Sequence, residues 1–236
     1  MRKLVVSTFI TLDGVMQAPG GPEEDPTGGF THGGWSVNYW DDAMGRRMDE
    51  YMARPFDLLL GRRTYEIFAA HWPHVTDDAP AGEGGPEALG ETAGSAAGPL
   101  NSATKYVASR TLQRVDWVNS RLIEGDVASA VAQLKKEDGP EIQVHGSANL
   151  IQTLLQHDLI DEFRLMVFPL VLGTGKRLFA NGTMPEGLKL RDSTTSTTGV
   201  LIATYERAGA IDYGSFALAE PTPAEIERRQ GLAAHE

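Results

Sequence analysis

Cysteine is absent from this chain of 236 residues. Disulfide bonds, thiolate catalysis and cysteine-ligated metal sites are therefore excluded, and we expect no metal centre. A chain without disulfides suits a reducing compartment, and we expect a cytoplasmic protein. The length fits one large domain or two small ones, and hydrophobic residues make up 41% of the chain, which is enough for a sizeable core.

Long apolar runs are missing as well. The first one begins at Leu4, reaches only Ile10 and is interrupted by Ser7 and Thr8. It is shorter than the ~20 apolar residues that cross a bilayer, and too short for a signal-peptide core followed by a cleavage site. The run therefore predicts a first β-strand, and we expect no membrane partner.

Positive charge is scarce. Lysine and arginine number 21 against 32 acidic residues, which gives a formal net charge of −11. No long basic stripe offsets this charge, so the composition argues against nucleic acid as a partner. Local clusters such as Arg62-Arg63 and Lys176-Arg177 can still bind a small anionic molecule.

The apolar pattern predicts an α/β fold. Helices are expected over residues 39–52, 63–70, 126–137 and 147–156, and strands over residues 3–11, 57–60, 105–108, 121–123, 142–145, 163–168, 188–195 and 199–206. Strands that alternate with helices predict a mixed, mostly parallel sheet flanked by helices, and the last two strands predict a C-terminal antiparallel hairpin at its edge.

Two segments differ in composition from the rest. Residues 74–100 are rich in Ala, Gly, Glu and Pro, which predicts a surface insertion or a lid within a domain of residues 1–207. Residues 208–236 form a C-terminal tail in which Thr222-Pro223 is typical of a helix start. The apolar segment 163–179 is expected to form an edge strand that needs covering, either by the tail or by a second copy of the chain.

A strand runs directly into a helix at Gly61. The start of a helix exposes unpaired backbone N–H groups and the positive end of the helix dipole, so it favours anions. Gly61 allows close approach of a ligand, Arg62 and Arg63 add guanidinium groups suited to phosphate, and Thr64 adds a hydroxyl. The alternative is an ordinary helix cap in an α/β unit.

Two further strand ends carry similar signals. Ser109 and Arg110 follow the strand 105–108, and Gly146-Ser147-Ala148 lies between the strand 142–145 and the next helix. A phosphomonoester needs two or more charge-assisted donors, which arginine supplies well. The alternative at the first site is a helix cap at Ser109 with a solvated Arg110. The alternative for His145, at the end of the strand 142–145, is a hydrogen bond to the backbone and no contact with a ligand.

The pattern Gly-Arg-x-Thr-Tyr-Glu at residues 61–66 resembles the cofactor-phosphate motif of the dihydrofolate reductase superfamily. Pro-x-x-x-Gly-x-Gly at residues 169–175 is similar to its branch related to the reductase domain of riboflavin biosynthesis. The resemblance covers about residues 2–207 and implies the dihydrofolate-reductase-like fold with NADPH as cofactor. It implies that Arg62, Ser109 and Arg110 hold the 2′-phosphate and that Gly146 lies against the pyrophosphate. Ser147 departs from the Gly-Gly usual there.

The resemblance also suggests residues near the substrate. Asp13 matches an aspartate of the riboflavin-type reductases, and Trp35 resembles an aromatic beside the substrate pocket. Dihydrofolate reductases carry a carboxylate in the helix that follows the glycine-rich loop, where Asp42 is the candidate here. Asp41 and Asp49 are also candidates, and the register of Asp41 and Asp42 relative to Gly61 argues against folate reduction.

These patterns lead to an expected function. The resemblance implies an NADPH-dependent reductase that passes hydride to a small heterocyclic or carbonyl or imine substrate. The nearest named activity is reduction of 5-amino-6-(5-phosphoribosylamino)uracil in riboflavin biosynthesis. A cysteine-ligated zinc deaminase domain is excluded. The alternatives are a non-catalytic nucleotide-binding module of the same fold and a dihydrofolate reductase. The expected partners are a small-molecule substrate and a second copy of the chain in a homodimer, as is common among riboflavin-type relatives.

Overall fold

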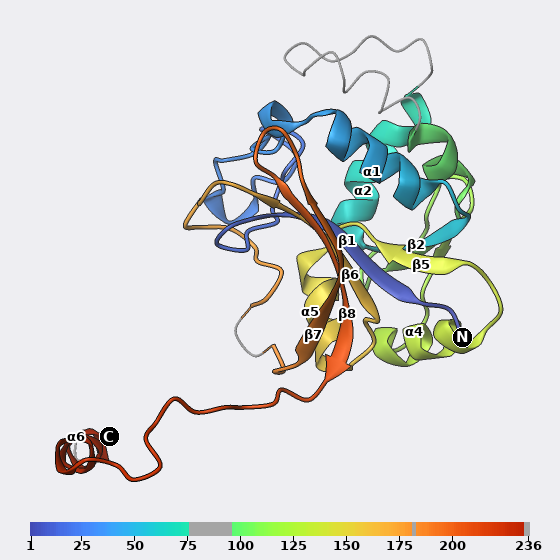
Figure 1. Ribbon diagram of the computed structural model, residues 1–236. Helices are drawn as coiled ribbons and strands as arrows, with labels where there is room; N and C mark the ends of the chain where they lie inside the picture. The colour runs from blue at the N-terminus through green and yellow to red at the C-terminus, as the bar shows by residue number, and fades with distance from the viewer. Residues whose placement is uncertain (76–95, 181–182, 234–236) are drawn as a thin grey trace.

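The computed structural model describes residues 1–75, 96–180 and 183–233. Their centre is an eight-stranded sheet with the order β4-β3-β2-β5-β1-β6-β8-β7 (Figure 1). The strands are β1 (Leu4–Thr11), β2 (Phe56–Gly61), β3 (Lys105–Ala108), β4 (Ser120–Leu122), β5 (Glu141–Val144), β6 (Glu162–Phe168), β7 (Gly187–Thr195) and β8 (Leu201–Gly209).

The pairing of the strands confirms the predicted mixed sheet. From β4 to β6 all neighbours are parallel, with Val6 opposite Val144 of β5 and opposite Phe163 of β6. β8 pairs antiparallel with both β6 and β7, so the chain ends its sheet in the expected hairpin. All eight predicted strands are present, with ends that differ by two residues or fewer, except for the last, which runs three residues further, to Gly209.

Helices cover both faces of the sheet (Figure 1). α4 (Val127–Lys136) and α5 (Ala148–Gln156) pack on one face, and α1 (Asp42–Met52) and α2 (Arg62–His71) on the other. Alternate residues of a strand point to opposite faces. Leu59 accordingly packs with α4 and α5, whereas its neighbours Leu58 and Leu60 pack beneath α1 and α2.

Capping residues set the helix starts. The carboxylate of Asp41 accepts a hydrogen bond from Met44 N at 3.0 Å, so α1 begins at Asp42 and the residues before it form a short 3-10 turn, Val37–Tyr39. The expected helix start at residue 39 was therefore three residues early. Asp126 caps α4 in the same way, through Ser129 N at 2.8 Å.

Part of the segment 74–100 was interpreted wrongly. Residues 76–95 lie outside the described residues, so the interpretation of these as a surface insertion or lid stays untested. Residues 96–102 are helical, and Ala96, Ala97 and Leu100 are buried. Leu100 belongs to the cluster beneath α1 and α2, so the end of the segment belongs to the core.

The edge of the sheet is also not where the sequence placed it. β6 is paired on both edges, with β1 and β8, and its apolar residues alternate into two buried clusters on the two faces of the sheet. The edge strands are β4 and β7, and in β7 the apolar Leu188 and Leu190 are 38% and 49% exposed. Beyond Gly209 the tail leads away from the sheet to α6 (Pro223–Ala233), which lies apart from the body of the molecule (Figure 1).

Candidate active site

A cleft of about 1620 Å³ opens at the carboxyl ends of the parallel strands. Gly61 at the end of β2, Ala108 at the end of β3 and His145 directly after β5 all line it. The amino ends of α2, α4 and α5 border the same space. In open α/β sheets this edge is the usual ligand site, because the loops there are free to diverge and the helix starts present N–H groups.

The first junction joins β2 to α2. Gly61 is the N-cap of α2 with an extended backbone (φ −74°), and its side-chain position is closed because a Cβ would meet the Ser147 side chain at 3.0 Å. The Arg62 guanidinium donates to Glu66 Oε1 and to Thr111 Oγ1, both at 2.7 Å, and remains 49% exposed. These two contacts hold the Arg62 side chain between α2 and the loop after β3.

The second junction follows β3. Ser109 Oγ accepts hydrogen bonds from Thr111 N at 3.2 Å and Leu112 N at 3.0 Å, so the hydroxyl shapes the turn. Ser109, Arg110 and Thr111 line the cleft next to Arg62 and Arg63. Three arginines thus border one part of the cleft of a protein with a net charge of −11, and this local charge favours an anion.

The third junction joins β5 to α5. Gly146 has φ +109°, and Ser147, the N-cap of α5, has φ +71°. Positive φ is costly for a residue with a side chain, so Ser147 needs compensation. Its hydroxyl supplies this, since it accepts from Gly61 N at 2.8 Å and donates to Thr64 Oγ1 at 2.7 Å. One hydroxyl therefore ties the β2–α2 and β5–α5 junctions together.

All nine residues expected at the cofactor line this cleft. They come from the three junctions and are Gly61, Arg62, Arg63, Thr64, Ser109, Arg110, Gly146, Ser147 and Ala148.

None of the three residues expected at the substrate lines the cleft. Asp13 accepts hydrogen bonds from Thr11 Oγ1 (2.5 Å), Leu172 N (3.2 Å) and Gly173 N (2.8 Å), and pairs with Arg177. The Thr11 hydroxyl, followed by these other donors, holds the pKa of Asp13 well below its usual range. In this geometry Asp13 fastens the loop after β1 to the loop after β6.

Trp35 and Asp42 are likewise engaged elsewhere. The Trp35 indole donates from Nε1 to Gln17 O at 2.8 Å, and its ring meets Phe168 edge-on at 5.1 Å. Asp42 lies in the first turn of α1 and is exposed. The catalytic roles suggested for Asp13, Trp35 and Asp42 stay predictions, and each residue has a structural position that accounts for it without a ligand.

Further carboxylates border the cleft, among them Asp49, which the sequence analysis named as a candidate, and Glu24, which it did not. Asp49 lies two helical turns after Asp42, on the same side of α1, and lines the cleft with Met48 and Met52. Because both residues lie on one face of the helix, the i, i+7 spacing does not by itself choose between Asp42 and Asp49. Glu24, from the loop after β1, also borders the cleft and accepts from Gly20 N at 2.6 Å. Burial raises the pKa of Glu24.

No helix among residues 1–75, 96–180 and 183–233 has the length and apolar character needed to cross a membrane.

Comparison with known proteins identifies relatives of this fold. The model of the RibD C-terminal domain family matches residues 2–202. An uncharacterized protein of Bacillus subtilis, YyaP, is 27% identical over 216 residues, which cover 88% of this chain and 96% of YyaP.

Two solved structures are similar at low sequence identity. A pyrimidine reductase-like protein from Corynebacterium diphtheriae is 11% identical with a TM-score of 0.52, over 87% of this chain and 92% of that one. Dihydrofolate reductase from Enterococcus faecalis, solved with NADP(H) and RAB-propyl, is 14% identical with a TM-score of 0.50, over 87% of this chain and 96% of that one. These likenesses show the dihydrofolate-reductase-like fold.

Proposed function

Since the chain belongs to the RibD C-terminal domain family, we propose that it is an NADPH-dependent reductase acting on a small heterocyclic or carbonyl or imine substrate. The observation that carries the proposal is the convergence of two strand–helix junctions, the loop after β3 and three arginines on one cleft. Helix starts and arginines together are suited to a ligand with several phosphates.

The donor set fits a nicotinamide dinucleotide. Arg62, Ser109 and Arg110 border one region of the cleft and would hold a 2′-phosphate, which distinguishes NADPH from NADH. Gly146 and the first N–H groups of α5 would hold the pyrophosphate. The cleft volume of about 1620 Å³ exceeds the roughly 300–1,000 Å³ of a typical small-ligand pocket. It therefore has room for a dinucleotide together with a small substrate.

The chemistry divides between cofactor and protein. NADPH supplies the hydride when it is bound. The residues of this chain bind the phosphates, orient the reactants and exclude water from the cleft. Reduction of 5-amino-6-(5-phosphoribosylamino)uracil is the substrate assignment that the family favours, and a related heterocycle is an equal candidate because the family relative YyaP is uncharacterized.

A non-catalytic nucleotide-binding module of the same fold is the main alternative. It is favoured by the position of Asp13, Trp35 and Asp42 outside the cleft lining. Folate reduction is the weaker alternative, because Asp42, the candidate for the folate-binding carboxylate, lies outside the lining, and the cleft carboxylate of α1 is Asp49, seven residues later.

Fluorescence titration with NADPH, followed by oxidation assays on pyrimidines and pteridines, tests these proposals. Saturable NADPH binding with oxidation by an aminopyrimidine is the expected result. Binding without oxidation by any compound favours the module, oxidation by dihydrofolate alone favours folate reduction, and absence of NADPH binding contradicts all three.

We also propose that the protein is a homodimer whose interface includes the late strands. Along β7 the exposed Leu188 and Leu190 accompany an unpaired sheet edge, and the tail exposes apolar residues such as Phe216, Ile226 and Leu232. An exposed apolar edge favours pairing with another chain. Sedimentation at micromolar concentration is expected to give twice the chain mass of 25.5 kDa, whereas a single species of that mass contradicts the dimer.

A further inference from the structure

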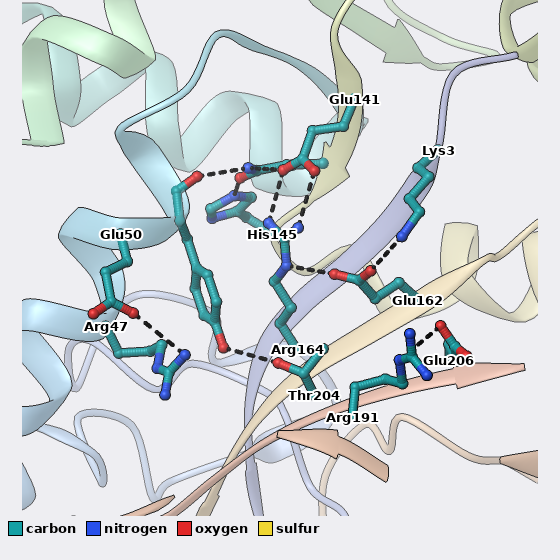
Figure 2. A network of polar contacts seen from close by, with 12 residues as sticks. Lys3, Arg47, Glu50, Glu141, His145, Glu162, Arg164, Arg191, Thr204 and Glu206 are labelled. Carbon is teal, nitrogen blue, oxygen red and sulfur yellow. Dashed lines mark hydrogen bonds and ion pairs between the residues drawn. The ribbon is translucent and has the colours of Figure 1, made fainter. Parts of the chain in front are cut away.

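His145 is the first residue after β5 and lines the cleft. It also belongs to a network of polar contacts (Figure 2). Its imidazole stacks on Phe56 with 6.4 Å between ring centres. Its Nε2 is 2.6 Å from Oε1 of Gln143, a residue whose exposed fraction is 0%. The direction of this one hydrogen bond determines what the other ring nitrogen can offer to a ligand.

The surroundings of Gln143 fix the orientation of its amide. Nε2 of Gln143 donates to the backbone oxygen of Tyr51 at 3.1 Å and to Glu141 Oε1 at 2.6 Å. A backbone carbonyl can only accept, and so can an ionised carboxylate. A flipped amide would place Oε1 against two acceptors, which leaves buried atoms unpaired at a cost.

The Glu141 carboxylate is held in its ionised form. Arg164 donates to both of its oxygens, at 2.7 Å and 2.9 Å, and donates from Nε to Glu162 at 2.8 Å. Although burial opposes ionisation, these contacts lower the pKa of Glu141. The network thus runs Arg164 to Glu141 to Gln143 to His145, and each donor and acceptor along it is determined.

The tautomer of His145 follows from this order. Because both N–H groups of Gln143 are used on acceptors, its Oε1 accepts, and Nε2 of His145 must carry the proton. Burial, followed by the charge of Arg164 and opposed by that of Glu141, lowers the pKa of His145 to about 4. At neutral pH the ring is therefore uncharged and its Nδ1 has a lone pair.

Nδ1 of His145 has no hydrogen-bond partner in the part of the chain that the structure describes. It is also not among the buried, unpaired polar atoms of that part, so it reaches the open space that the residue lines. The adjoining Gly146 is the residue proposed above to meet the dinucleotide pyrophosphate. A neutral acceptor beside that site is suited to a hydroxyl or amide N–H and unsuited to a phosphate.

We propose that His145 accepts, at Nδ1, a hydrogen bond from a hydroxyl or amide N–H of the bound nicotinamide dinucleotide, and that Gln143, Glu141 and Arg164 are positioning residues that keep Nδ1 free for it. The proposal rests on the NADPH-binding function proposed above. It leaves the 2′-phosphate to the arginines and the pyrophosphate to the start of α5, and gives His145 recognition of a neutral part of the cofactor.

Nitrogen NMR of the full chain labelled with ¹⁵N-histidine tests the proposal, because protonated and bare ring nitrogens have well-separated shifts. The His145→Phe variant identifies the His145 signals among those of the six histidines. Before addition of NADPH we expect a neutral ring with the proton on Nε2 from pH 8 to pH 5. A proton on Nδ1, or a charged ring at pH 7, overturns the proposal.

Addition of NADPH then tests the contact itself. We expect the Nδ1 signal to move in the direction of hydrogen-bond acceptance, and no such movement in the exposed His157. NADPH that binds without moving Nδ1 overturns the role of His145 and leaves the cofactor assignment intact. Failure of NADPH to bind overturns the proposed function, and the contact with it, whereas the ligand-free spectra still report the tautomer.

Variants separate recognition from folding. His145→Phe keeps a ring on Phe56 but removes the acceptor, and we expect NADPH affinity to fall about tenfold, as for one lost hydrogen bond. Gln143→Met keeps the imidazole but removes the acceptor that fixes its tautomer, so its ¹⁵N spectrum should show the two neutral tautomers in exchange. We expect a smaller loss of NADPH affinity in this variant. His157→Gln is the control and should leave affinity unchanged. Equal NADPH affinity in wild type and His145→Phe overturns the proposal.

Discussion

The two sides of the cleft hold their residues differently. Gly61, Gly146 and Ser147, from the two strand–helix junctions, line open space at the start of α2 and α5, and Arg110 lines the same space. In the loop after β1, by contrast, the Asp13 carboxylate accepts hydrogen bonds from Thr11, Leu172 and Gly173 and forms an ion pair with Arg177. The first side is the one proposed to receive a ligand, whereas the contacts of the second hold two loops together.

The difference shows which residues a sequence can place. A helix start leaves N–H groups unpaired wherever it occurs, so a strand followed by glycine and a helix predicts the position of an anion site directly. The partners of a loop carboxylate depend on contacts far along the chain. Asp13 and Gly173 are 160 residues apart, and no local pattern predicts their meeting.

The largest expected effect is at Gly146. Its φ of +109° is unfavourable for a side chain, and a Cβ there would meet Thr64 only at 3.6 Å, so the protein has room to fold. The strain costs about 1–3 kcal/mol of stability. We expect Gly146→Val to remain folded by circular dichroism and to lose NADPH binding, because the side chain occupies the place of the pyrophosphate.

Gly173 offers a matched control for that variant. It has a similarly positive φ of +76° and no atom within 4 Å of a Cβ, and it does not line the cleft. Gly173→Val should therefore lose comparable stability but keep its NADPH affinity. If Gly146→Val binds NADPH as wild type does, the glycine serves packing alone and the junction is not a ligand site.

The next effect is at Arg62. Its guanidinium is fixed by Glu66 and Thr111 at the cleft. Arg62→Ala removes the charged hydrogen bonds to the 2′-phosphate, so it should weaken NADPH binding by about 1.5–3 kcal/mol and change NADH binding little. Titration of both cofactors measures this, with Arg114→Ala as control, since Arg114 is 82% exposed and lies outside the cleft lining. Equal losses for NADPH and NADH would contradict the 2′-phosphate assignment.

The sequence therefore predicted which residues line one side of the cleft and little of the other side. Its strands and helices follow from local rules of periodicity and capping. The nine cofactor-side positions came from the strand ends and from the family resemblance, and all nine line the cleft, while their roles stay predictions. Ser147 was a departure from the family pattern, and the structure gives its reason, since its hydroxyl links Gly61 to Thr64. The burial of residues 96–100 and the position of the sheet edge depend on tertiary packing, which composition does not report.

Asp13 gives a smaller effect of a different kind. Its pKa is held low by Thr11 and the loop N–H groups, so the ionised form stabilises the fold above the unfolded pKa of about 4, and this contribution is lost as the pH falls below that value. We expect Asp13→Ala to lower stability by about 1–3 kcal/mol at pH 7. Its difference from wild type should shrink in urea titrations repeated toward pH 3. NADPH affinity should be unchanged, so a variant of normal stability that lacks turnover would instead support a catalytic Asp13.

The smallest effect is expected at Asp42, which lies outside the cleft lining. Asp42 is exposed in the first turn of α1, where a negative charge gains about 0.3–1 kcal/mol from the helix dipole. Asp42→Asn should cost no more than that in thermal unfolding and should leave NADPH oxidation unaffected. The matched variant is Asp49→Asn, because Asp49 lies two turns further on the same face and lines the cleft, so any carboxylate function of α1 should be lost there. A greater loss of turnover in Asp42→Asn than in Asp49→Asn would return that function to Asp42 and would mean that the cleft closes around α1 when substrate binds.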